Sequence, residues 1–373
     1  MEIVIREVKT KKDLKQFIDF QYNLYKDSPF FVPSIRANVF DTFDKTKNPN
    51  FEFCDVRLWT ASKNGQVVGR VAGIINRRYN QLKSESLVRF GWLDFIDDCN
   101  VLERLIKTVE KWGEESGFKK IHGPLGMTNF DPCGMLVEGF DEVATSNSVY
   151  NFPYYHEHLE KLGFEKEADW VEYKIAVPEK TPDQMKRIAK IVKEKYKLEV
   201  VNPSSKKEML QYGEGVFKLL NEAYRGLYIV IDFDQKQIEY LIKKYLPELP
   251  PRYICLVLLN GEVIAFGISI PSLSKALQKA NGRLFPFGFI HLMRALKKNT
   301  VIDLMLIAVK PEYQSKGINS IMFDELIPKY IEDGIVYVET NSELESNVKV
   351  QSQWKFFDPR MTKRKRSYIK SIS

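Results

Sequence analysis

The chain carries the same β-hairpin signature in each half of its 373 residues. In both places an Asn-Gly pair separates two strand-like runs, and Asn-Gly is the strongest short-range signal for a two-residue hairpin turn. The first hairpin covers residues 55–75 and turns at Asn64-Gly65, and the second covers residues 253–270 and turns at Asn260-Gly261. A fold that contains this hairpin twice must include two antiparallel strand pairs in similar structural positions.

The elements that follow each hairpin also repeat. A strand-like run and an amphipathic helix pattern come next in both halves, at residues 87–117 and again at residues 301–330. A chain of this length suits two cores better than one. The sequence therefore predicts an α+β protein, with mixed α/β sheets and helices on both faces, divided into tandem domains at residues 1–178 and 179–373.

The strand at residues 301–309 leads into the most distinctive stretch of the chain. It is followed by Lys310-Pro-Glu-Tyr-Gln-Ser-Lys-Gly-Ile-Asn319 and then by a helical run. A helix that opens at Gly317 presents unpaired backbone N–H groups and the positive end of its dipole, which is a favourable place for an anion. Pro328 lies inside the helical run and predicts that the helix kinks or ends there.

The run from Val309 to Ile318 resembles the acyl-CoA-binding motif of the GCN5-related N-acetyltransferases (GNATs), in which a strand, a loop and a helix hold the coenzyme A pyrophosphate. Asn319 departs from the motif at its last small residue. The resemblance implies acetyl-CoA or another acyl-CoA as the cofactor, bound by the strand edge and the loop. The implied cofactor-binding residues are Ile307, Ala308, Val309, Gln314, Ser315, Lys316, Gly317, Ile318 and Asn319.

The resemblance extends over both halves, as two tandem GNAT-like (acyl-CoA N-acyltransferase) domains. Residues 158–175 resemble the final helix and strand of such a domain. The loop before the first domain's helix carries Asp97 and Asp98 and no glycine. Carboxylates at a helix N-terminus satisfy its N–H groups and complement its dipole, so they fill the anion site. We therefore expect the first domain to be degenerate, with a structural or substrate-binding role.

The reaction that the resemblance implies is transfer of an acetyl or other acyl group from a CoA thioester to an amine of a small molecule or peptide. The backbone N–H of Val309 is the implied oxyanion donor. Glu339 and Asp303 are the predicted catalytic bases. A carboxylate within an apolar strand is costly to bury, and burial raises its pKa toward that of a base.

Two other functions stay open. Trp354 stands where the family often places an acidic tyrosine, so that either Tyr313 or Tyr337 protonates the leaving thiolate or the thiolate leaves unaided. Trp354 and Asn319 favour a non-catalytic ligand-binding or scaffold protein built on degenerate GNAT domains. A Fem-like aminoacyltransferase is the second alternative, because those enzymes also use tandem GNAT-like folds. That activity needs an aminoacyl-tRNA, and the sequence shows neither a helical tRNA-binding arm nor a basic stripe.

A loop region of the first half collects polar side chains. Residues 122–134 are broken by glycine and proline, and residues 150–155 add tyrosine and asparagine. Loops on a rigid scaffold often carry function. The alternative is a long loop held by its own turns. The predicted substrate-binding residues are Asn129, Asp131, Tyr150, Asn151 and Tyr154.

Two basic segments have structural and functional interpretations. Residues 272–299 form an insertion with an apolar run at residues 284–293 and lysines and arginines on either side. This pattern predicts an acyl-chain or substrate lid, a membrane-surface contact, or a helical hairpin that covers the domain junction. The run Lys363–Arg366, ahead of a final strand at residues 367–371, is interpreted as a solvated sheet edge.

Composition limits the partners. The net charge of +7 is modest, and no nucleic-acid-reading motif accompanies it, so no nucleic acid is expected. The four cysteines lie too far apart for a disulfide framework or a zinc site. No signal-peptide core and no run of about 18 apolar residues is present. The sequence predicts a cytoplasmic protein without an integral membrane segment, and peripheral membrane contact stays open.

Overall fold

The computed structural model describes residues 2–372, which fall into two compact units. Both units are discontinuous in sequence. The predicted boundary at residue 178 divides the sequence into two copies of a domain, and it stays a prediction. The two compact units are defined by contacts instead, and each unit contains segments from both sides of that boundary. Unit 1 is made of residues 2–171, 274–291 and 363–372, and unit 2 of residues 172–273 and 292–362.

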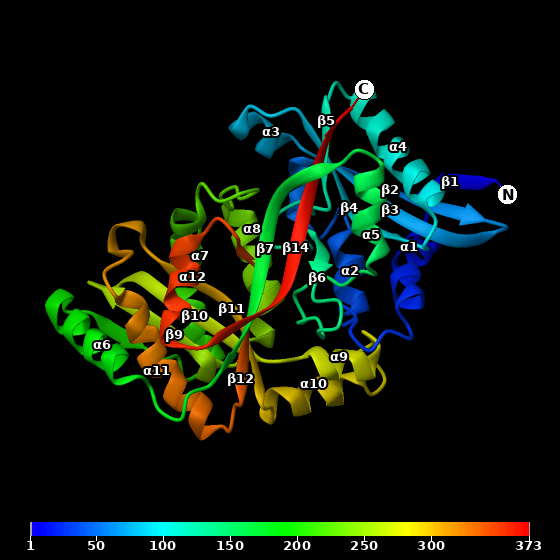
Figure 1. The fold of residues 1–373 in the computed structure, drawn as a ribbon. Coiled ribbons are helices and arrows are strands. Elements are labelled where there is room, and N and C mark those ends of the chain that lie inside the picture. The colour runs from blue at the N-terminus through cyan, green and yellow to red at the C-terminus, as the bar shows by residue number, and fades with distance from the viewer. Residues whose placement is uncertain (1, 373) are drawn as a thin grey trace. The chain divides into compact units, whose positions relative to one another are not determined.

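Antiparallel pairing builds the first part of unit 1 (Figure 1). β1 to β4 pair in sequence order, and β2 and β3 form the predicted hairpin at Asn64-Gly65. β4 and β5 are parallel, and β5 and β6 both pair with the last part of β14. The strands with residues in unit 1 are β1 (Ile3–Glu7), β2 (Cys54–Lys63), β3 (Gln66–Asn76), β4 (Leu87–Phe95), β5 (Lys120–Gly123), β6 (Met135–Glu138), β7 (Glu165–Ala176) and β14 (Pro359–Ser371).

Helices cover both faces of β3, as the sequence predicts. Side chains alternate between the faces of a strand. A Cβ on Gly69 would lie 2.9 Å from side chains of α4, whereas Ala72 and Ile74 pack in a core cluster with Phe17 of α1. The helices of unit 1 are α1 (Lys11–Leu24), α2 (Arg36–Thr42), η1 (Pro49–Glu52), α3 (Arg77–Lys83), α4 (Cys99–Glu115), α5 (Tyr154–Lys161) and α9 (Ser274–Ala280), and α10 (Gly288–Lys297) has residues in both units.

Unit 2 repeats the strand order of unit 1. β8 to β11 are antiparallel neighbours, β9 and β10 form the second predicted hairpin at Asn260-Gly261, and β11 and β12 are parallel. β12 pairs with the last part of β7. This repetition is the structural counterpart of the repeated sequence pattern. The remaining strands are β8 (Glu199–Val201), β9 (Ile254–Leu259), β10 (Glu262–Pro271), β11 (Val301–Val309), β12 (Tyr337–Thr340) and β13 (Glu343–Leu344).

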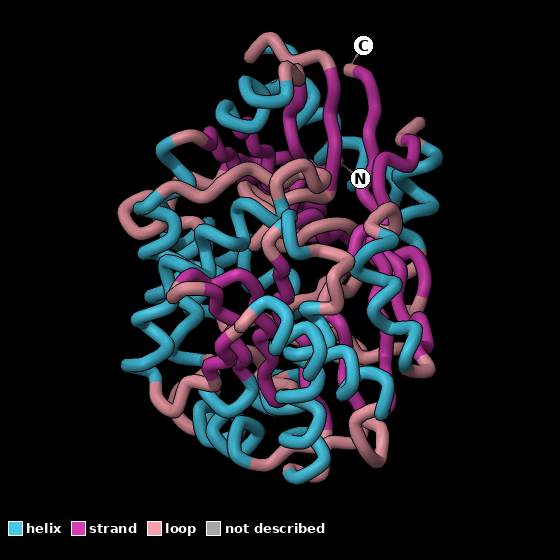
Figure 2. Tube along the Cα trace, turned by 90° about the vertical axis from the view of Figure 1, so that its left-hand side faces the viewer, coloured by secondary structure: helices cyan, strands magenta, loops and turns pink. Residues whose placement is uncertain are grey.

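The core of unit 2 lies between its sheet and two helices, α6 and α11. In Figure 2, helices (cyan) flank the strands (magenta) throughout the chain. The sequence predicts a kink or an end of the helix near Pro328. α11 continues past Pro328 to Glu332, so it does not end at the proline. Buried Ile327 and Tyr330 hold the helix on both sides of the proline. The helices of unit 2 are α6 (Asp183–Tyr196), α7 (Lys206–Tyr224), α8 (Gln235–Tyr245), η2 (Leu246–Glu248), η3 (Pro251–Tyr253), η4 (Pro311–Tyr313), α11 (Ile318–Glu332), α12 (Val348–Gln351) and η5 (Ser352–Phe356).

Two long strands each contribute to both units. β7 gives residues 165–171 to unit 1 and residues 172–176 to unit 2, where they pair with β12. β14 gives residues 359–362 to unit 2 and residues 363–371 to unit 1, where they pair with β5. Each unit therefore completes its sheet with a strand segment from the other half of the sequence.

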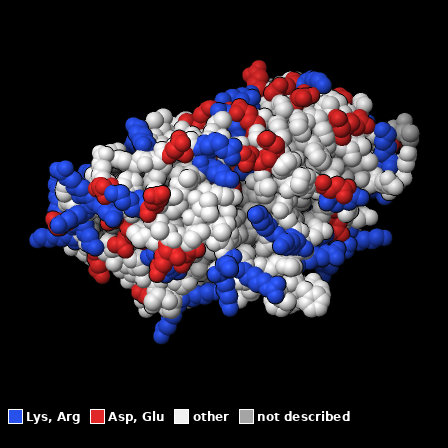
Figure 3. Space-filling model, turned by 60° about the horizontal axis from the view of Figure 1, so that its bottom comes forward, with Lys and Arg blue, Asp and Glu red and all other residues white. Residues whose placement is uncertain are grey.

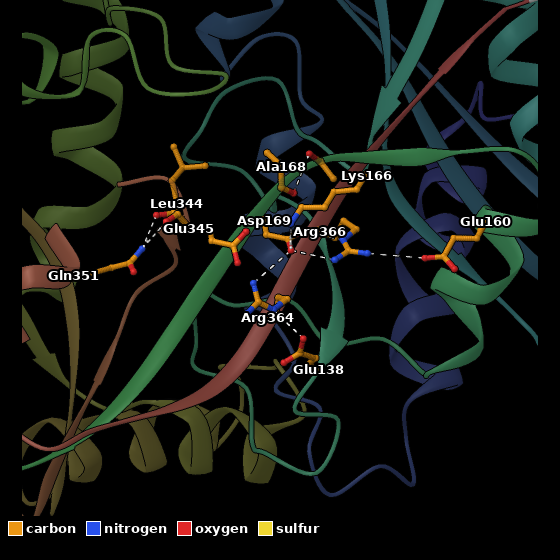
Figure 4. Close-up of polar contacts among 11 residues, drawn as sticks. Glu138, Glu160, Lys166, Ala168, Asp169, Leu344, Glu345, Gln351, Arg364 and Arg366 are labelled. Carbon is orange, nitrogen blue, oxygen red and sulfur yellow. Dashed lines mark hydrogen bonds and ion pairs between the residues drawn. The ribbon is translucent and has the colours of Figure 1, made fainter. Parts of the chain in front are cut away.

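A buried carboxylate fixes β14 in unit 1 (Figure 4). Asp169 of β7 accepts hydrogen bonds from Arg366 at 2.8 and 3.1 Å and from Arg364 at 3.4 Å, and it pairs with Lys166 at 2.7 Å. Arg364 also donates to Glu138 at 2.8 Å. Burial alone would raise the pKa of Asp169, but the hydrogen bonds from Arg366 and Lys166 outweigh burial and lower it.

The interpretation of Lys363–Arg366 as a solvated edge is therefore wrong. Lys363 and Lys365 are buried, with 2% and 3% of their surface exposed. β14 has neighbours on both sides in the sheet, β5 and β7, so the run belongs to an interior strand. The sequence shows four cations in a row, but it does not show the carboxylates from distant segments, Glu138 and Asp169, that pair with Arg364 and Arg366.

We expect Asp169→Asn to lower the free energy of unfolding by about 3 kcal/mol at neutral pH, because a neutral amide removes the buried negative charge that Arg364, Arg366 and Lys166 share. The folded-state pKa of Asp169 is depressed. The stabilisation is therefore full above its unfolded value of about 3.9 and is lost as the pH falls through the folded value. Urea unfolding of wild type and variant should converge at acid pH.

Asp183→Asn is the matched control for this substitution. Asp183 pairs with Lys180 at 2.8 Å, but its side chain is 76% exposed. We expect no measurable shift of its urea midpoint. Equal midpoints for Asp169→Asn and Asp183→Asn at neutral pH would contradict the anchoring role of Asp169.

Candidate functional site

The loop between β11 and α11 passes twice through left-handed backbone. Ser315 has a φ of 60°, and Gly317, the N-cap of α11, has a φ of 83°. Gly317 also lies close to α6, because a Cβ on it would be 2.7 Å from Cγ2 of Ile188. Only glycine meets both conditions without strain. The loop is thus held against α6, with Ser315 and Lys316 exposed.

Three successive backbone donors of this loop are open. Within residues 2–372, the N–H groups of Ser315, Lys316 and Gly317 have no hydrogen-bond acceptor. The preceding residue, Gln314, is fixed by its side-chain amide, which donates to the carbonyl of Val309 at 3.1 Å. Open N–H groups ahead of a helix, on a turned backbone, form an anion-binding concavity. The loop therefore fits a phosphate group.

The two lysines that flank the loop differ in their partners. Lys310 pairs with Glu262 at 2.9 Å, and this hydrogen bond raises the pKa of Lys310. The ammonium of Lys316 lies 5.2 Å from the ring centre of Tyr313 and 5.9 Å from that of Tyr196. Lys316 forms no ion pair within the described part of the chain, so it is the cation available to an anion at the loop.

β11 leaves part of its backbone edge unpaired. It pairs with β12 only from Val301 to Leu304. Met305 has no partner on β10, which makes a β-bulge, and the side chain of Asn341 donates to the Met305 carbonyl at 3.1 Å. A bulge re-aims a strand. Beyond this point β11 no longer pairs with β12, so its remaining residues have a strand neighbour only on the β10 side.

Backbone groups of this part of β11 are directed away from β10. The N–H of Lys310 donates to Ile264 on β10 at 2.8 Å, so the adjacent Val309 directs its own N–H away from β10. Ile307 points the same way as Val309, and the hydroxyl of Tyr224 at the end of α7 donates to the Ile307 carbonyl at 3.0 Å. Burial raises the pKa of Tyr224 to about 12, so its hydroxyl is protonated at neutral pH.

The corresponding edge in unit 1 is closed by tyrosines. By strand register, Phe95 of β4 corresponds to Val309 of β11. Tyr155 accepts a hydrogen bond from the Phe95 N–H at 3.1 Å, and Tyr154 donates to the Phe95 carbonyl at 2.6 Å. Both backbone groups that are directed away from β3 are thus satisfied by α5. Unit 1 has no open strand edge at this position.

The side chains at the neighbouring strand position also differ between the two units. Asp94 forms a buried ion pair with Arg70 at 2.7 Å and accepts a hydrogen bond from Tyr25 at 2.9 Å. The residue of unit 2 in the register position of Asp94 is Ala308. A paired carboxylate occupies this place in unit 1, where unit 2 has only a methyl group.

The helix N-terminus of unit 1 is also closed, as predicted. Asp98 is the N-cap of α4 and accepts from the N–H of Asn100 at 3.0 Å. Lys63 pairs with the same carboxylate at 3.1 Å. Burial would raise the pKa of Asp98, but the hydrogen bonds from Lys63 and Asn100 outweigh burial and lower it. A bound anion would meet this fixed negative charge.

The predicted catalytic acids are neighbours in unit 2. Asp303 of β11 is the register partner of Glu339 of β12. The adjacent residues Ile302 and Val338 belong to the core, so the two carboxylates lie on the opposite face of the sheet. Asp303 is buried, with 3% of its surface exposed, and Glu339 is partly exposed. Their catalytic role stays a prediction.

Sequence reasoning did not identify a third carboxylate, Glu343. The indole N–H of Trp354 donates to its two oxygens at 3.0 and 3.3 Å. Burial raises the pKa of Glu343 to about 7, and the hydrogen bond from Trp354 acts in the opposite direction. Glu343 lies two residues after Asn341, and Asn341 marks the point where β11 and β12 separate. The negative charge of Glu343 also adds to the burial that raises the pKa of Tyr224. It is therefore near the open edge.

The two tyrosines that the sequence offered as proton donors lie elsewhere in unit 2. The ring of Tyr313 packs against Tyr196, with ring centres 6.0 Å apart. The ring of Tyr337 lies under the ammonium of Lys174 at 3.6 Å. Tyr224, by contrast, contacts the β11 edge directly. Its signal in the sequence is its place at the end of α7, the same place that Tyr25 has after α1.

The predicted substrate-binding residues all lie in unit 1. Asn151 accepts from the Leu136 N–H at 2.7 Å and donates to its carbonyl at 3.1 Å, and Tyr154 closes the Phe95 edge. These two side chains therefore have structural contacts. Tyr150 and the Asn129 amide oxygen are buried, and Asp131 accepts from the Thr128 N–H at 2.9 Å. A substrate-binding role stays a prediction for Asn129, Asp131, Tyr150, Asn151 and Tyr154.

Residues 2–372 contain neither a metal-binding cluster nor a membrane-spanning helix. No cluster of three or more His, Cys, Asp or Glu side chains there could hold a metal ion. No helix in that range combines the length and the apolar content needed to cross a bilayer.

Comparison with known proteins agrees with this geometry. A family model described as the acetyltransferase (GNAT) family matches residues 214–351. The chain is 26% identical to protein YghO of Escherichia coli (strain K12) over 376 residues, which cover 99% of this chain and 95% of that protein. It is 25% identical to the bacterial ceramide synthase of Caulobacter vibrioides (strain NA1000 / CB15N) over 324 residues, which cover 84% and 82%.

Solved structures share the fold over the whole chain. A tandem GNAT protein from the clavulanic acid biosynthesis pathway matches with a TM-score of 0.54 and 11% identity, covering 100% of this chain and 99% of that one. A GCN5-related N-acetyltransferase from Sphaerobacter thermophilus matches with a TM-score of 0.51 and 10% identity, covering 99% and 96%. The fold is thus that of tandem GNAT proteins.

We expect Gly317→Ala to destabilise the protein by about 2 kcal/mol or more, because it adds both left-handed strain and a contact with Ile188. Gly334→Ala is the matched variant, since Gly334 has a φ of 70° and nothing within 4 Å of its Cβ direction. It should cost only the strain, about 1 kcal/mol. Urea unfolding measures both. Equal losses would contradict the close packing of the loop on α6.

Proposed function

We propose that the chain is an acyl-CoA-dependent N-acyltransferase, with its cofactor in unit 2 between the open edge of β11 and the loop before α11. The contrast at one backbone position carries this proposal. The N–H of Val309 is directed away from β10 and lies beyond the end of the β12 ladder, whereas the hydroxyl of Tyr155 accepts the N–H of Phe95. The family match in the second half of the chain supports the same assignment.

The residues of the loop fit the phosphates of coenzyme A. The N–H groups of Ser315, Lys316 and Gly317 would donate to the pyrophosphate, and the Lys316 ammonium would add a positive charge. Ile307, Ala308 and Val309 would border the pantetheine arm, while Gln314 and Ile318 fix the two ends of the loop. Asn319, partly exposed at the second position of α11, would offer a side-chain amide in place of the family's small residue.

Two groups at the β11 edge suit the chemistry of acyl transfer. As the amine attacks the thioester carbonyl, a C–N bond forms and the carbonyl oxygen becomes negative. The N–H of Val309 would stabilise that oxygen. When the C–S bond then breaks, the protonated hydroxyl of Tyr224 would donate its proton to the departing sulfur.

We further propose Glu343 as the group that accepts the proton of the attacking amine. Its pKa of about 7 leaves it partly ionised at neutral pH, which suits a general base. Trp354 would orient the carboxylate. Glu339 and Asp303, on the adjacent strands, are the alternative bases, and substitution distinguishes the three.

The acceptor is proposed to be an amine of a small molecule or peptide. The relative named a bacterial ceramide synthase supports the use of long-chain amines and long-chain acyl-CoA as test substrates beside acetyl-CoA. Release of free thiol from the CoA thioester gives one readout for all of these pairs.

Isothermal titration of the wild type with acetyl-CoA is expected to show saturable binding. Gly317→Glu should weaken it at least ~10-fold, because the new carboxylate repels phosphate at the loop and its Cβ meets Ile188. Gly334→Glu, at an open left-handed position away from the loop, should bind as the wild type does. An absence of binding by a folded wild type would reject the cofactor assignment.

We expect kcat/KM for acyl transfer to rise as the pH passes through about 7, because the base must lose its proton. Trp354→Phe removes the donor that lowers the pKa of Glu343, so the rising limb should move up by about one pH unit. Glu343→Gln should abolish it. If Glu339→Gln or Asp303→Asn abolishes the limb and Glu343→Gln preserves it, the base is misassigned.

A further inference from the structure

The turn between α9 and α10 exposes three aromatic side chains. Phe285, Phe287 and Phe289 have 78%, 69% and 44% of their surface in solvent. The rings of Phe285 and Phe289 lie 6.0 Å apart, so they form one apolar surface. Single exposed apolar residues are ordinary, but a contiguous aromatic group on a surface marks a contact with something else. We call these three residues the aromatic tip.

The aromatic tip is presented by an ordered scaffold within unit 1. Gln278 of α9 donates to the carbonyls of Pro29 at 2.8 Å and Phe31 at 3.0 Å. The N–H of Arg36 donates to the carbonyl of Gly282 at 2.9 Å. The apolar side of α9 is buried beneath these contacts, through Ala276 and Leu277. The inner apolar residues of the insertion are therefore buried in unit 1, whereas the aromatic tip stays exposed to solvent.

The segment that carries the aromatic tip is positively charged. Residues 272–299 contain six lysines and arginines and no aspartate or glutamate. Lys275, Lys279 and Arg283 are exposed in unit 1, and none of them forms an ion pair within residues 2–372. On the face drawn in Figure 3, blue lysine and arginine side chains extend from the lower edge beside uncharged white surface. Elsewhere the chain pairs many of its surface cations with carboxylates, whereas these three are unpaired among the described residues.

An anionic bilayer matches both properties at once. Phenylalanine rings insert below the headgroups, while lysine and arginine at the same level meet lipid phosphates. A protein partner would more often offer carboxylates to pair with the unpaired cations and a hydrophobic pocket of fixed shape for the rings. Three strongly exposed rings suit a deformable surface better than a rigid pocket.

We propose that the α9–α10 turn docks the protein on the surface of an anionic phospholipid bilayer, with the aromatic tip inserted and Lys275, Lys279 and Arg283 at the headgroups. This contact is independent of acyl transfer, because it involves neither the β11 edge nor the loop before α11. It adds a location at a membrane surface to a chain in which no described helix could span one.

The test is co-sedimentation of the full chain with phosphatidylcholine vesicles and with vesicles that also contain phosphatidylglycerol. We expect binding to the anionic vesicles, and a fall at least ~10-fold in the partition coefficient between low and high salt. The triple substitution Phe285→Ser, Phe287→Ser and Phe289→Ser should lower the partition coefficient at least ~10-fold. Lys275→Glu, Lys279→Glu and Arg283→Glu together should do the same.

A matched triple variant controls for the loss of exposed apolar surface. Leu82, Leu210 and Val348 have 63%, 52% and 69% of their surface exposed and lie outside the α9–α10 turn. Their substitution by serine should leave vesicle binding unchanged, and circular dichroism should show that all variants are folded. Failure of the wild type to bind anionic vesicles would overturn the proposal, as would equal binding by the aromatic-tip variant.

A second measurement separates a bilayer from a protein partner. Phe287→Trp should show a blue shift of its emission on addition of anionic vesicles, relative to the wild type under the same conditions. Sedimentation velocity tests self-association through the same turn. Concentration-dependent dimers that the aromatic-tip substitutions abolish, together with no blue shift, would assign the turn to a second copy of the chain and overturn membrane docking.

Discussion

The carboxylate of Asp169 between two guanidinium groups is the interaction on which the architecture depends. It joins β7, from the middle of the chain, to β14, from its C-terminal part, inside unit 1. It adds a side-chain anchor to the backbone pairing that places residues 363–371 beside β5 and β6. A buried charge is an expensive device, and it is stable here because several donors satisfy the same carboxylate. Its geometry also selects the register of β14, since both arginines must reach one side chain.

The two units show what happens to one fold when its copies take different roles. Both keep the hairpin, the parallel strand pair and a bulge in the strand that leads to the helix. In unit 1, tyrosines and a buried ion pair then occupy the place that the bulge opens. In unit 2, the matching positions hold an alanine and a backbone N–H without such a cover. The difference rests on a few side chains, because the backbone framework is the same.

Local patterns carried the predictions that the structure confirms. The two Asn-Gly hairpins, the strand Val301–Val309, the capping role of Asp98 and the helix start at Gly317 each depend on residues that are close in sequence. The closure of the Phe95 edge joins residues that are 59 and 60 positions apart, and no local pattern reports such a contact. The interpretation of Lys363–Arg366 failed for the same reason, because the balancing carboxylates come from other segments.

The candidate site also has parts that local sequence patterns predict and parts that they do not. Its loop was visible as a motif, and its acids were sought where carboxylates interrupt apolar strands. Glu343 stands in a polar stretch after β12, so its burial could not be inferred from its neighbours. Trp354, read from the sequence as the loss of a tyrosine, instead donates the hydrogen bond that holds Glu343. A substitution at a familiar position can therefore mark a new pairing as well as a lost function.

The exchange of strands between the halves of the chain sets an order for biogenesis. Domains usually fold as they leave the ribosome, with the N-terminal one first. Here β5 of unit 1 lacks its neighbour until residues 363–371 have been made, while unit 2 already has residues 172–176 of β7 when its own strands emerge. The half that is synthesised second can thus complete its sheet before the half that is synthesised first. Nascent unit 1 therefore keeps one edge of β5 uncovered until the last residues of the chain have been synthesised.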